Sequence, residues 1–261
     1  MYFGANDDEP PRVQRILPNG EVGLCFYRGQ AVVYDGIGPV RSCVSGQLMH
    51  YQDIVSSGPI DIVGVHLTTI GAHVLLCRPM SDIGSHVVSL QDLNDADLLR
   101  LEQLIAAAGD YEACFALMDT FFLRRLATTT IDTIDTLNIR RICRALAYGG
   151  CHTADAHIPD IASEACVSER QFTRLFTRMV GIAPKEYLRL QRFHSALHAL
   201  KGAVLLPEGS SPSDTLAQIA MSQGYCDYAH LYADFRKISG YTPRQLVELS
   251  ANDDDAYGWR M

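Results

Sequence analysis

Residues 158–181 read Ile-Pro-Asp-Ile-Ala-Ser-Glu-Ala-Cys-Val-Ser-Glu-Arg-Gln-Phe-Thr-Arg-Leu-Phe-Thr-Arg-Met-Val-Gly, which predicts two short helices joined by a tight turn. Pro159 suits the first turn of a helix, where its missing N–H would have no intrahelical partner. Ser168 is a predicted N-cap after the turn, and Gln171 three residues later completes a capping box. Gly181 is placed to end the second helix in a left-handed conformation. The stretch is therefore a predicted helix-turn-helix unit.

The second of these helices is expected to bury one face and expose the other. Its apolar residues recur with the spacing of a buried helical stripe. They are Phe172, Leu175, Phe176 and Met179. The predicted DNA contacts on and beside the outer face are Arg170, Gln171, Thr173, Arg174, Thr177 and Arg178. A major groove admits an α-helix, and arginine there donates two hydrogen bonds to guanine. A solvated helix face is the alternative, but the cap, turn and stripe together favour DNA.

A similar plan recurs further along the chain. Pro184 opens a predicted linker helix over residues 184–200, about 25 Å long at 1.5 Å per residue. A predicted loop rich in Gly, Ser and Pro follows at residues 202–213. Residues 214–240 then form the second predicted unit, with Asp227 as a helix cap and a glycine at its end.

The residues of these two units resemble the AraC/XylS family of transcription regulators over roughly residues 139–249. The resemblance lies in Ile161-Ala162, Val167-Ser168-Glu169-Arg170-Gln171, Leu175-Phe176, Gly181-Ile182-Ala183-Pro184, Tyr187-Leu188, Ile219-Ala220, Gly224-Tyr225-Cys226-Asp227, His230-Leu231, Phe235-Arg236 and Gly240-Tyr241-Thr242-Pro243. It implies a single-chain DNA reader whose two units enter successive major grooves, about 34 Å apart.

The resemblance also implies unequal roles for the two units. In the first, Arg170, Thr173 and Arg174 are expected to face bases, and Arg178 the backbone. The second departs from the family pattern, because Tyr232 and Ala233 stand where a polar residue and an arginine are usual. There Tyr228, Ala229 and Tyr232 are expected to contact thymine methyls or sugars, and Arg236 a phosphate. The first unit should therefore dominate sequence discrimination, and His230 is expected to pack at the helix start.

Charge is divided unevenly along the chain, although the net charge of −8 seems at first to exclude nucleic acid. Residues 1–136 carry 8 Lys/Arg against 17 Asp/Glu, whereas residues 137–250 carry 13 against 10. Residues 166–192 hold six cations and two glutamates. A basic region on an acidic whole is the pattern expected of a DNA-binding domain beside another domain.

The first half of the chain has a different residue pattern, in which short runs of Val, Ile and aromatic residues are separated by turn residues. Predicted strands lie at residues 22–26, 31–34, 40–44 and 60–67, and helices at 93–126. The fold expected is α+β: a small β-barrel or sandwich with following helices over residues 1–130, then an all-α domain over 137–250. The chain has no apolar run long enough to span a membrane and no secretory leader pattern, so a cytoplasmic protein is expected.

The first half also resembles the cupin-like domain found in one subgroup of the same family. Such a domain implies effector binding or dimerisation, the helices at 93–126 offering a partner face. Tyr34, Arg41, His50 and His66 are the residues we expect in an effector pocket. The histidines also raise the alternative of a metal-dependent enzyme, but no H-x-H pair with a following glutamate is present, so neither a metal nor another cofactor is expected.

These features favour a sequence-specific transcription regulator without enzymatic activity, activation being the default in the family. Its expected partners are double-stranded DNA, a small-molecule effector, a second copy of the chain and, for an activator, RNA polymerase. Two alternatives stay open. One is a metal-dependent barrel enzyme tethered to DNA. The other is a DNA-binding module with a purely structural dimerisation domain.

Overall fold

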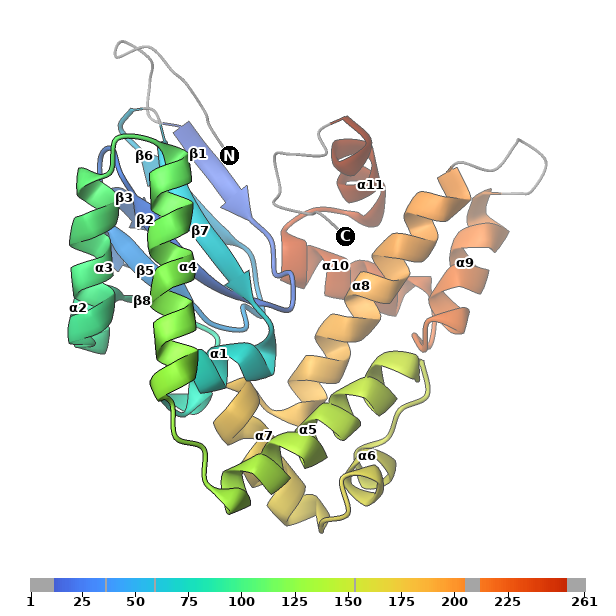
Figure 1. Ribbon diagram of the computed structural model, residues 1–261. Helices are drawn as coiled ribbons and strands as arrows, with labels where there is room; N and C mark the ends of the chain where they lie inside the picture. Colours follow the sequence, from blue (N-terminus) through green and yellow to red (C-terminus); the bar gives the residue numbers. More distant parts are fainter. Residues whose placement is uncertain (1–11, 36, 59, 153, 205–211, 253–261) are drawn as a thin grey trace.

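The computed structural model describes residues 12–35, 37–58, 60–152, 154–204 and 212–252. Two β-sheets and the helices that cover one of them form the first half, and helices alone form the second (Figure 1). The predicted α+β fold with an all-α C-terminal half is confirmed. Residues 129–132, between two helices, join the halves.

Eight short strands form two four-stranded sheets in which all neighbours are antiparallel. They are β1 (Arg12–Ile16), β2 (Val22–Tyr27), β3 (Val32–Tyr34), β4 (Ile37–Val40), β5 (Ser42–Ser45), β6 (Gln52–Ser56), β7 (Ile62–Leu67) and β8 (Val87–Ser89). The sheet orders are β1-β6-β3-β4 and β7-β2-β5-β8. The single strand predicted at 40–44 is divided, because the chain crosses from one sheet to the other at exposed Arg41. Strands β1, β6 and β8 were not predicted.

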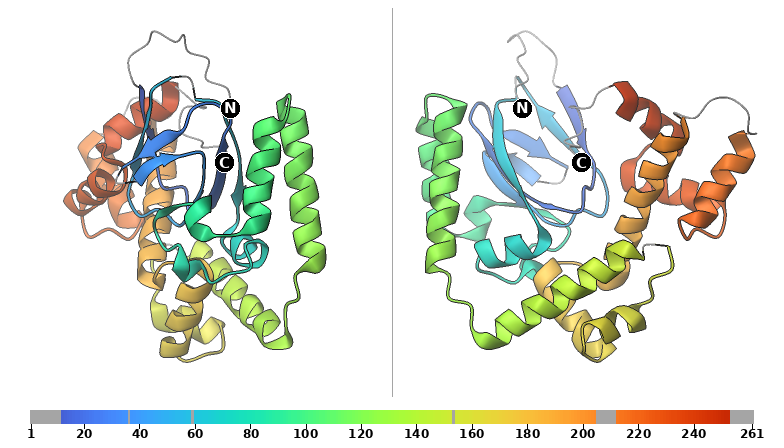
Figure 2. Two further views of the ribbon diagram at one scale, coloured as in Figure 1. Left: turned by 90° about the vertical axis from the view of Figure 1, so that its left-hand side faces the viewer. Right: turned by 45° about the vertical axis from the view of Figure 1, so that its right-hand side comes forward.

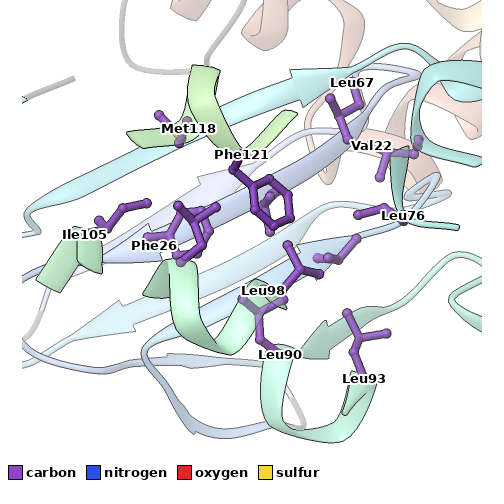
Figure 3. Close-up of a cluster of buried hydrophobic side chains, with 14 of the residues drawn as sticks. Val22, Phe26, Leu67, Leu76, Leu90, Leu93, Leu98, Ile105, Met118 and Phe121 are labelled. Carbon is purple, nitrogen blue, oxygen red and sulfur yellow. The ribbon is translucent and has the colours of Figure 1, made fainter. Parts of the chain in front are cut away.

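Strand β2 has both faces covered, which explains its apolar composition. Successive side chains point to opposite faces, so Val22, Leu24 and Phe26 face the helices while Cys25 and Tyr27 face the other sheet. The covering helices are α2 (Leu90–Leu93), α3 (Ala96–Ala107) and α4 (Tyr111–Thr128), and Figure 3 shows their apolar side chains over this sheet. Each large side chain buried here stabilises the fold by about 1.5–3 kcal/mol.

The connection from β7 to β8 holds two short helical elements that the sequence did not predict. They are α1 (Thr69–Leu75) and the 3-10 turn η1 (Met80–Asp82). Both pack against the C-terminal half of the chain. They therefore belong to the contact between the two halves.

Seven helices build the second half within the described residues. They are α5 (Thr133–Cys151), α6 (Ile158–Glu164), α7 (Glu169–Val180), α8 (Pro184–Val204), α9 (Pro212–Ser222), α10 (Tyr228–Ser239) and α11 (Pro243–Asn252). Helix α8 runs to Val204, past the end predicted at residue 200, and its 21 residues span about 31 Å. Part of the loop predicted at 202–213 is therefore helical, and residues 205–211 lie outside the described part. Figure 2 shows α8 running from the group formed by α5, α6 and α7 to the group formed by α9, α10 and α11.

Candidate nucleic-acid interface

Helix α7 begins and ends as its sequence predicts. The Ser168 hydroxyl caps its start by accepting a hydrogen bond of 3.4 Å from the Gln171 N–H. Gly181 ends the helix in the left-handed conformation, with φ of 97°. The predicted apolar stripe is buried. The helix therefore has a fixed orientation against α5, α6 and α8, with one face left outward.

The outward face of α7 carries the arginines. Arg170, Thr173, Arg174 and Arg178 are exposed, and Gln171 and Thr177 are half-buried. Within the described ranges, no ion pair or side-chain hydrogen bond engages Arg170, Arg174 or Arg178. Their guanidinium groups therefore remain available to an anionic partner.

Arg178 has a second environment that sequence reasoning missed. It lines a cavity of about 440 Å³ together with Arg78, Arg125 and residues of the 129–131 segment. The cavity lies where α1, α4, α5 and α7 meet. Arg178 thus lies at the edge of the exposed face, beside the first half of the chain.

The second unit has the predicted cap and turn, but the outward face of α10 carries fewer arginines than that of α7. The Asp227 carboxylate accepts a hydrogen bond of 2.7 Å from the His230 N–H at the start of α10. Ala229, Tyr232 and Arg236 are exposed, and Tyr228 is half-buried. The His230 ring packs edge-on against Tyr225, with ring centroids 5.2 Å apart.

Asp234 of α10 has a structural partner that sequence reasoning missed. Its carboxylate is buried and accepts hydrogen bonds from Arg189 of α8, at 3.0 Å from Nε and 2.6 Å from Nη2. Arg189 belongs to the cluster of six cations, so this carboxylate neutralises part of the predicted basic region. The pairing ties the second unit to the linker helix.

Comparisons with known proteins agree with this geometry. A family model described as a helix-turn-helix domain matches residues 161–248, and one described as a domain of unknown function (DUF6597) matches residues 1–89. The HTH-type transcriptional activator RhaS of Escherichia fergusonii is 26% identical over 153 residues, which span 57% of this chain and 51% of RhaS. Residues 161–248 therefore form a helix-turn-helix domain.

Solved structures are similar at low identity. An AraC-type transcriptional regulator from Chromobacterium violaceum is 24% identical with a TM-score of 0.37, the match covering 43% of this chain and 93% of that chain. ToxT from Vibrio cholerae is 11% identical with a TM-score of 0.47, the match covering 92% and 98%. Among the described helices of the present chain, none is long and apolar enough to cross a membrane.

The two sheets together with helices α1 to α4 are called the β domain. This domain contacts the helix-turn-helix domain first at the end of α7. Turn η1 packs against α7, and a Cβ added to Gly181 would lie 3.0 Å from the Met80 carbonyl oxygen. That separation is tighter than most Cβ contacts, so only glycine fits without a shift. Gly181 thus both ends α7 and packs against η1.

The second contact lies at the end of α10. The Tyr51 N–H donates a hydrogen bond of 2.8 Å to the Ile238 carbonyl, and His50 Nδ1 lies 3.0 Å from the Lys237 carbonyl oxygen. The Arg15 guanidinium lies 3.8 Å from the ring centroid of Tyr51 and 5.0 Å from that of Tyr241.

The Arg15 guanidinium is held in place by a carboxylate of the β domain. It donates two hydrogen bonds of 2.8 Å to Asp53. This hydrogen bonding lowers the pKa of Asp53, against the opposing effect of partial burial. Arg15 therefore stays charged and oriented between the two tyrosine rings of the interface.

A cavity of about 280 Å³ lies between the two sheets of the β domain. Of the four residues expected in an effector pocket, Tyr34 and His66 line it. Arg41 and His50 do not. Arg41 is exposed and donates to the Gly29 carbonyl at 3.3 Å, and His50 lies at the α10 contact. Across the part of the chain that the structure describes, no group of three or more His, Cys, Asp and Glu residues is arranged to hold a metal ion.

Proposed function

We propose that this chain is a sequence-specific transcription regulator in which α7 enters a major groove of DNA. The observation that carries the proposal is the row of exposed, unpaired arginines on a helix that is capped at both ends. Arg170 and Arg174 lie one helical turn apart and are free to donate to guanine edges. Arg178, at the far end of the row, would lie close to a phosphate.

In this proposal the two helix-turn-helix units read two major grooves, and the first unit contributes most of the sequence discrimination. Helix α8 is about 31 Å long and adjacent major grooves on one face of DNA lie about 34 Å apart, so the spacing supports one unit per groove. Helix α10 has fewer polar groups to offer, since Arg236 already donates to the Gly240 carbonyl at 3.1 Å. We assign Tyr228, Ala229 and Tyr232 to contacts with thymine methyls or sugars.

Activation and effector binding extend the proposal. RhaS is named a transcriptional activator, which supports activation through RNA polymerase as the mode of action. The cavity between the sheets, with Tyr34 and His66 in its lining, is the proposed site of a small-molecule effector. The family resemblance and the position of this cavity between the two sheets support the assignment.

A second copy of the chain is the proposed partner of α4. Phe115, Leu123 and Leu126 are 50%, 67% and 58% exposed on its outer surface. Figure 1 shows α4 on the side of the β domain opposite α9 and α10. A two-fold dimer formed there buries the same apolar surface from both copies and leaves the recognition helices free.

The test of sequence reading is a binding titration of the full chain with DNA from its own upstream region. Arg174→Ala should weaken specific binding by about 1–3 kcal/mol and relax the preference at one base position. Arg178→Ala should weaken binding to all sequences alike and reduce the salt dependence. Arg100→Ala, an exposed arginine of α3, is the matched control and should change neither. An equal loss on specific and random DNA for Arg174→Ala contradicts base reading.

A further inference from the structure

Cys25 and Cys43 lie directly opposite each other on β2 and β5, on the faces that point toward the other sheet. Cys43 is fully buried, whereas Cys25 is half-buried and lines the 280 Å³ cavity. Their side chains therefore extend from the same face of the sheet at facing positions. Cys25 therefore borders the cavity, and Cys43 is buried beside it.

The strand register makes this pair too wide for a disulfide. The Tyr27 N–H donates to the Arg41 carbonyl at 2.7 Å, and because hydrogen-bonded and non-hydrogen-bonded pairs alternate, Cys25 and Cys43 also form a hydrogen-bonded pair. The Cβ atoms of such a pair lie about 5.5 Å apart, whereas a disulfide requires about 3.5–4.5 Å. A cation with bonds of about 2.3 Å to each sulfur spans the wider gap.

Gly64 leaves room beside this pair. It lies opposite Cys25 on β7, and a Cβ there would come within 3.4 Å of both Cys25 Cα and Cys25 Sγ. Without that side chain, Cys25 is open to the cavity, whose lining includes Ile16, Ile54 and Ile62. An incoming ion thus reaches the thiols through a largely apolar space.

Two tyrosines provide hydrogen bonding at the buried end of the pair. Tyr34 Oη lies 3.5 Å from Cys43 Sγ and 2.5 Å from Tyr27 Oη. The Tyr34 hydroxyl therefore lies where it can hydrogen-bond to the Cys43 sulfur.

The number of sulfur ligands selects the class of metal. Structural zinc requires four protein ligands, and the residues that the structure describes offer no group of three or more metal-binding side chains. Thiolates favour soft cations such as Cu(I). We propose that Cys25 and Cys43 form a two-coordinate site for Cu(I). Two S–H bonds break, two protons leave, two S–Cu bonds form, and copper stays monovalent. The single net negative charge faces the Tyr34 hydroxyl. This site goes beyond the proposed DNA reading and does not depend on it.

The test uses the full chain with its five exposed cysteines replaced by serine, because these would bind Cu(I) on the surface. They are Cys77, Cys143, Cys151, Cys166 and Cys226. The reduced protein is titrated anaerobically with Cu(I) against a chromophoric Cu(I) chelator. We expect one equivalent to be retained and X-ray absorption to show two sulfur neighbours. Cys25→Ser and Cys43→Ser should each abolish retention, while Cys114→Ser, which alters a buried thiol of α4, should leave it unchanged.

A conservative substitution tests the hydrogen-bonding role of Tyr34, and a second comparison covers the case in which the five-serine protein does not fold. Tyr34→Phe keeps the ring and should weaken Cu(I) binding by about 10–100-fold. If the five-serine protein does not fold, the same comparison in the otherwise unaltered chain should show one equivalent fewer bound in Cys25→Ser. Equal Cu(I) retention with and without Cys25, or no retention at all, overturns the proposal. A Cys25–Cys43 disulfide that forms readily under a mild thiol oxidant overturns it in favour of a redox pair.

Discussion

The backbone N–H of Tyr51 donates a hydrogen bond of 2.8 Å to the carbonyl of Ile238, in the last turn of α10. Helix α7 is contacted at the same position, its C-terminal end, by η1 at Gly181. The β domain therefore contacts α7 and α10 at their ends and leaves their outward residues exposed. Its effect on DNA binding is expected to come from where it holds these helices, without covering their reading faces.

Removal of the Arg15 guanidinium should loosen the contact at α10. Arg15→Ala eliminates the ion pair with Asp53 and the stacking on Tyr51 and Tyr241, so amide hydrogen exchange at residues 238–241 should become faster. Arg41→Ala removes an exposed arginine of the same domain and is the control. Unchanged exchange in Arg15→Ala would show that the backbone hydrogen bond alone holds the interface.

The Arg15–Asp53 ion pair also makes the contact with α10 sensitive to acid. Since the pKa of Asp53 is lowered in the folded chain, the stabilisation is present above the unfolded value of about 3.9 and is lost as the pH falls through the folded value. In Asp53→Asn the exchange at residues 238–241 should already be fast at neutral pH. It should also change less than in the unaltered chain on acidification.

Gly181→Ala should destabilise the protein by about 1–2 kcal/mol, the cost of left-handed backbone for a residue with a Cβ, and the Met80 carbonyl oxygen at 3.0 Å adds to it. Gly150→Ala is the matched control. Gly150 lies in helix α5 with nothing within 4 Å of an added Cβ, so alanine there should stabilise by about 0.5–1 kcal/mol. Urea unfolding measures both. Equal effects of the two substitutions would contradict the capping role of Gly181.

His194 should make stability depend on pH near neutrality. Burial lowers its pKa to about 4, whereas an unfolded histidine has a pKa of about 6.5. The unfolded chain then binds the proton more tightly, so stability is complete above about pH 6.5 and falls as the pH decreases toward 4. Between pH 7 and 5 the loss should be about 2 kcal/mol. Denaturant unfolding of His194→Gln should lack this part of the decline; an identical decline in both proteins would assign it to other groups.

A charge on the outer surface of α4 should prevent the proposed dimer. Leu123→Glu places a carboxylate on the apolar surface, where a two-fold axis brings two copies close together. Sedimentation should then show a monomer at concentrations where the unaltered chain is a dimer. Glu112→Gln, an exposed change on the same helix, is the control. A monomer in the unaltered chain contradicts the proposal outright.

Local signals in the sequence predicted the helical half well. Caps, stripes and stop residues act within one or two turns, so Ser168, Asp227 and Gly181 could be assigned from their neighbours alone. The linker helix was predicted too short, because the glycine at residue 202 suggested a loop. In the structure that residue continues α8.

Contacts between distant residues were the part that sequence reasoning could not supply. Asp234 is buried against Arg189, 45 residues away, and no local pattern in the sequence indicates this pairing. His50 was expected in an effector pocket, but it lies at a backbone carbonyl 187 residues further along the chain. Strand register likewise brought Cys25 beside Cys43, since nothing in their immediate neighbours marks them as a pair.

The continuous helix α8 sets the angle about its axis between the two helix-turn-helix units. Each residue inserted into it would advance the second unit by about 1.5 Å and turn it by about 100° around the helix axis. A single insertion would therefore point α10 away from the duplex while leaving every residue of both units intact. Substitutions at exposed positions of α8 should be tolerated far more readily than insertions or deletions, and under the proposed two-groove reading the length of this helix sets the operator spacing.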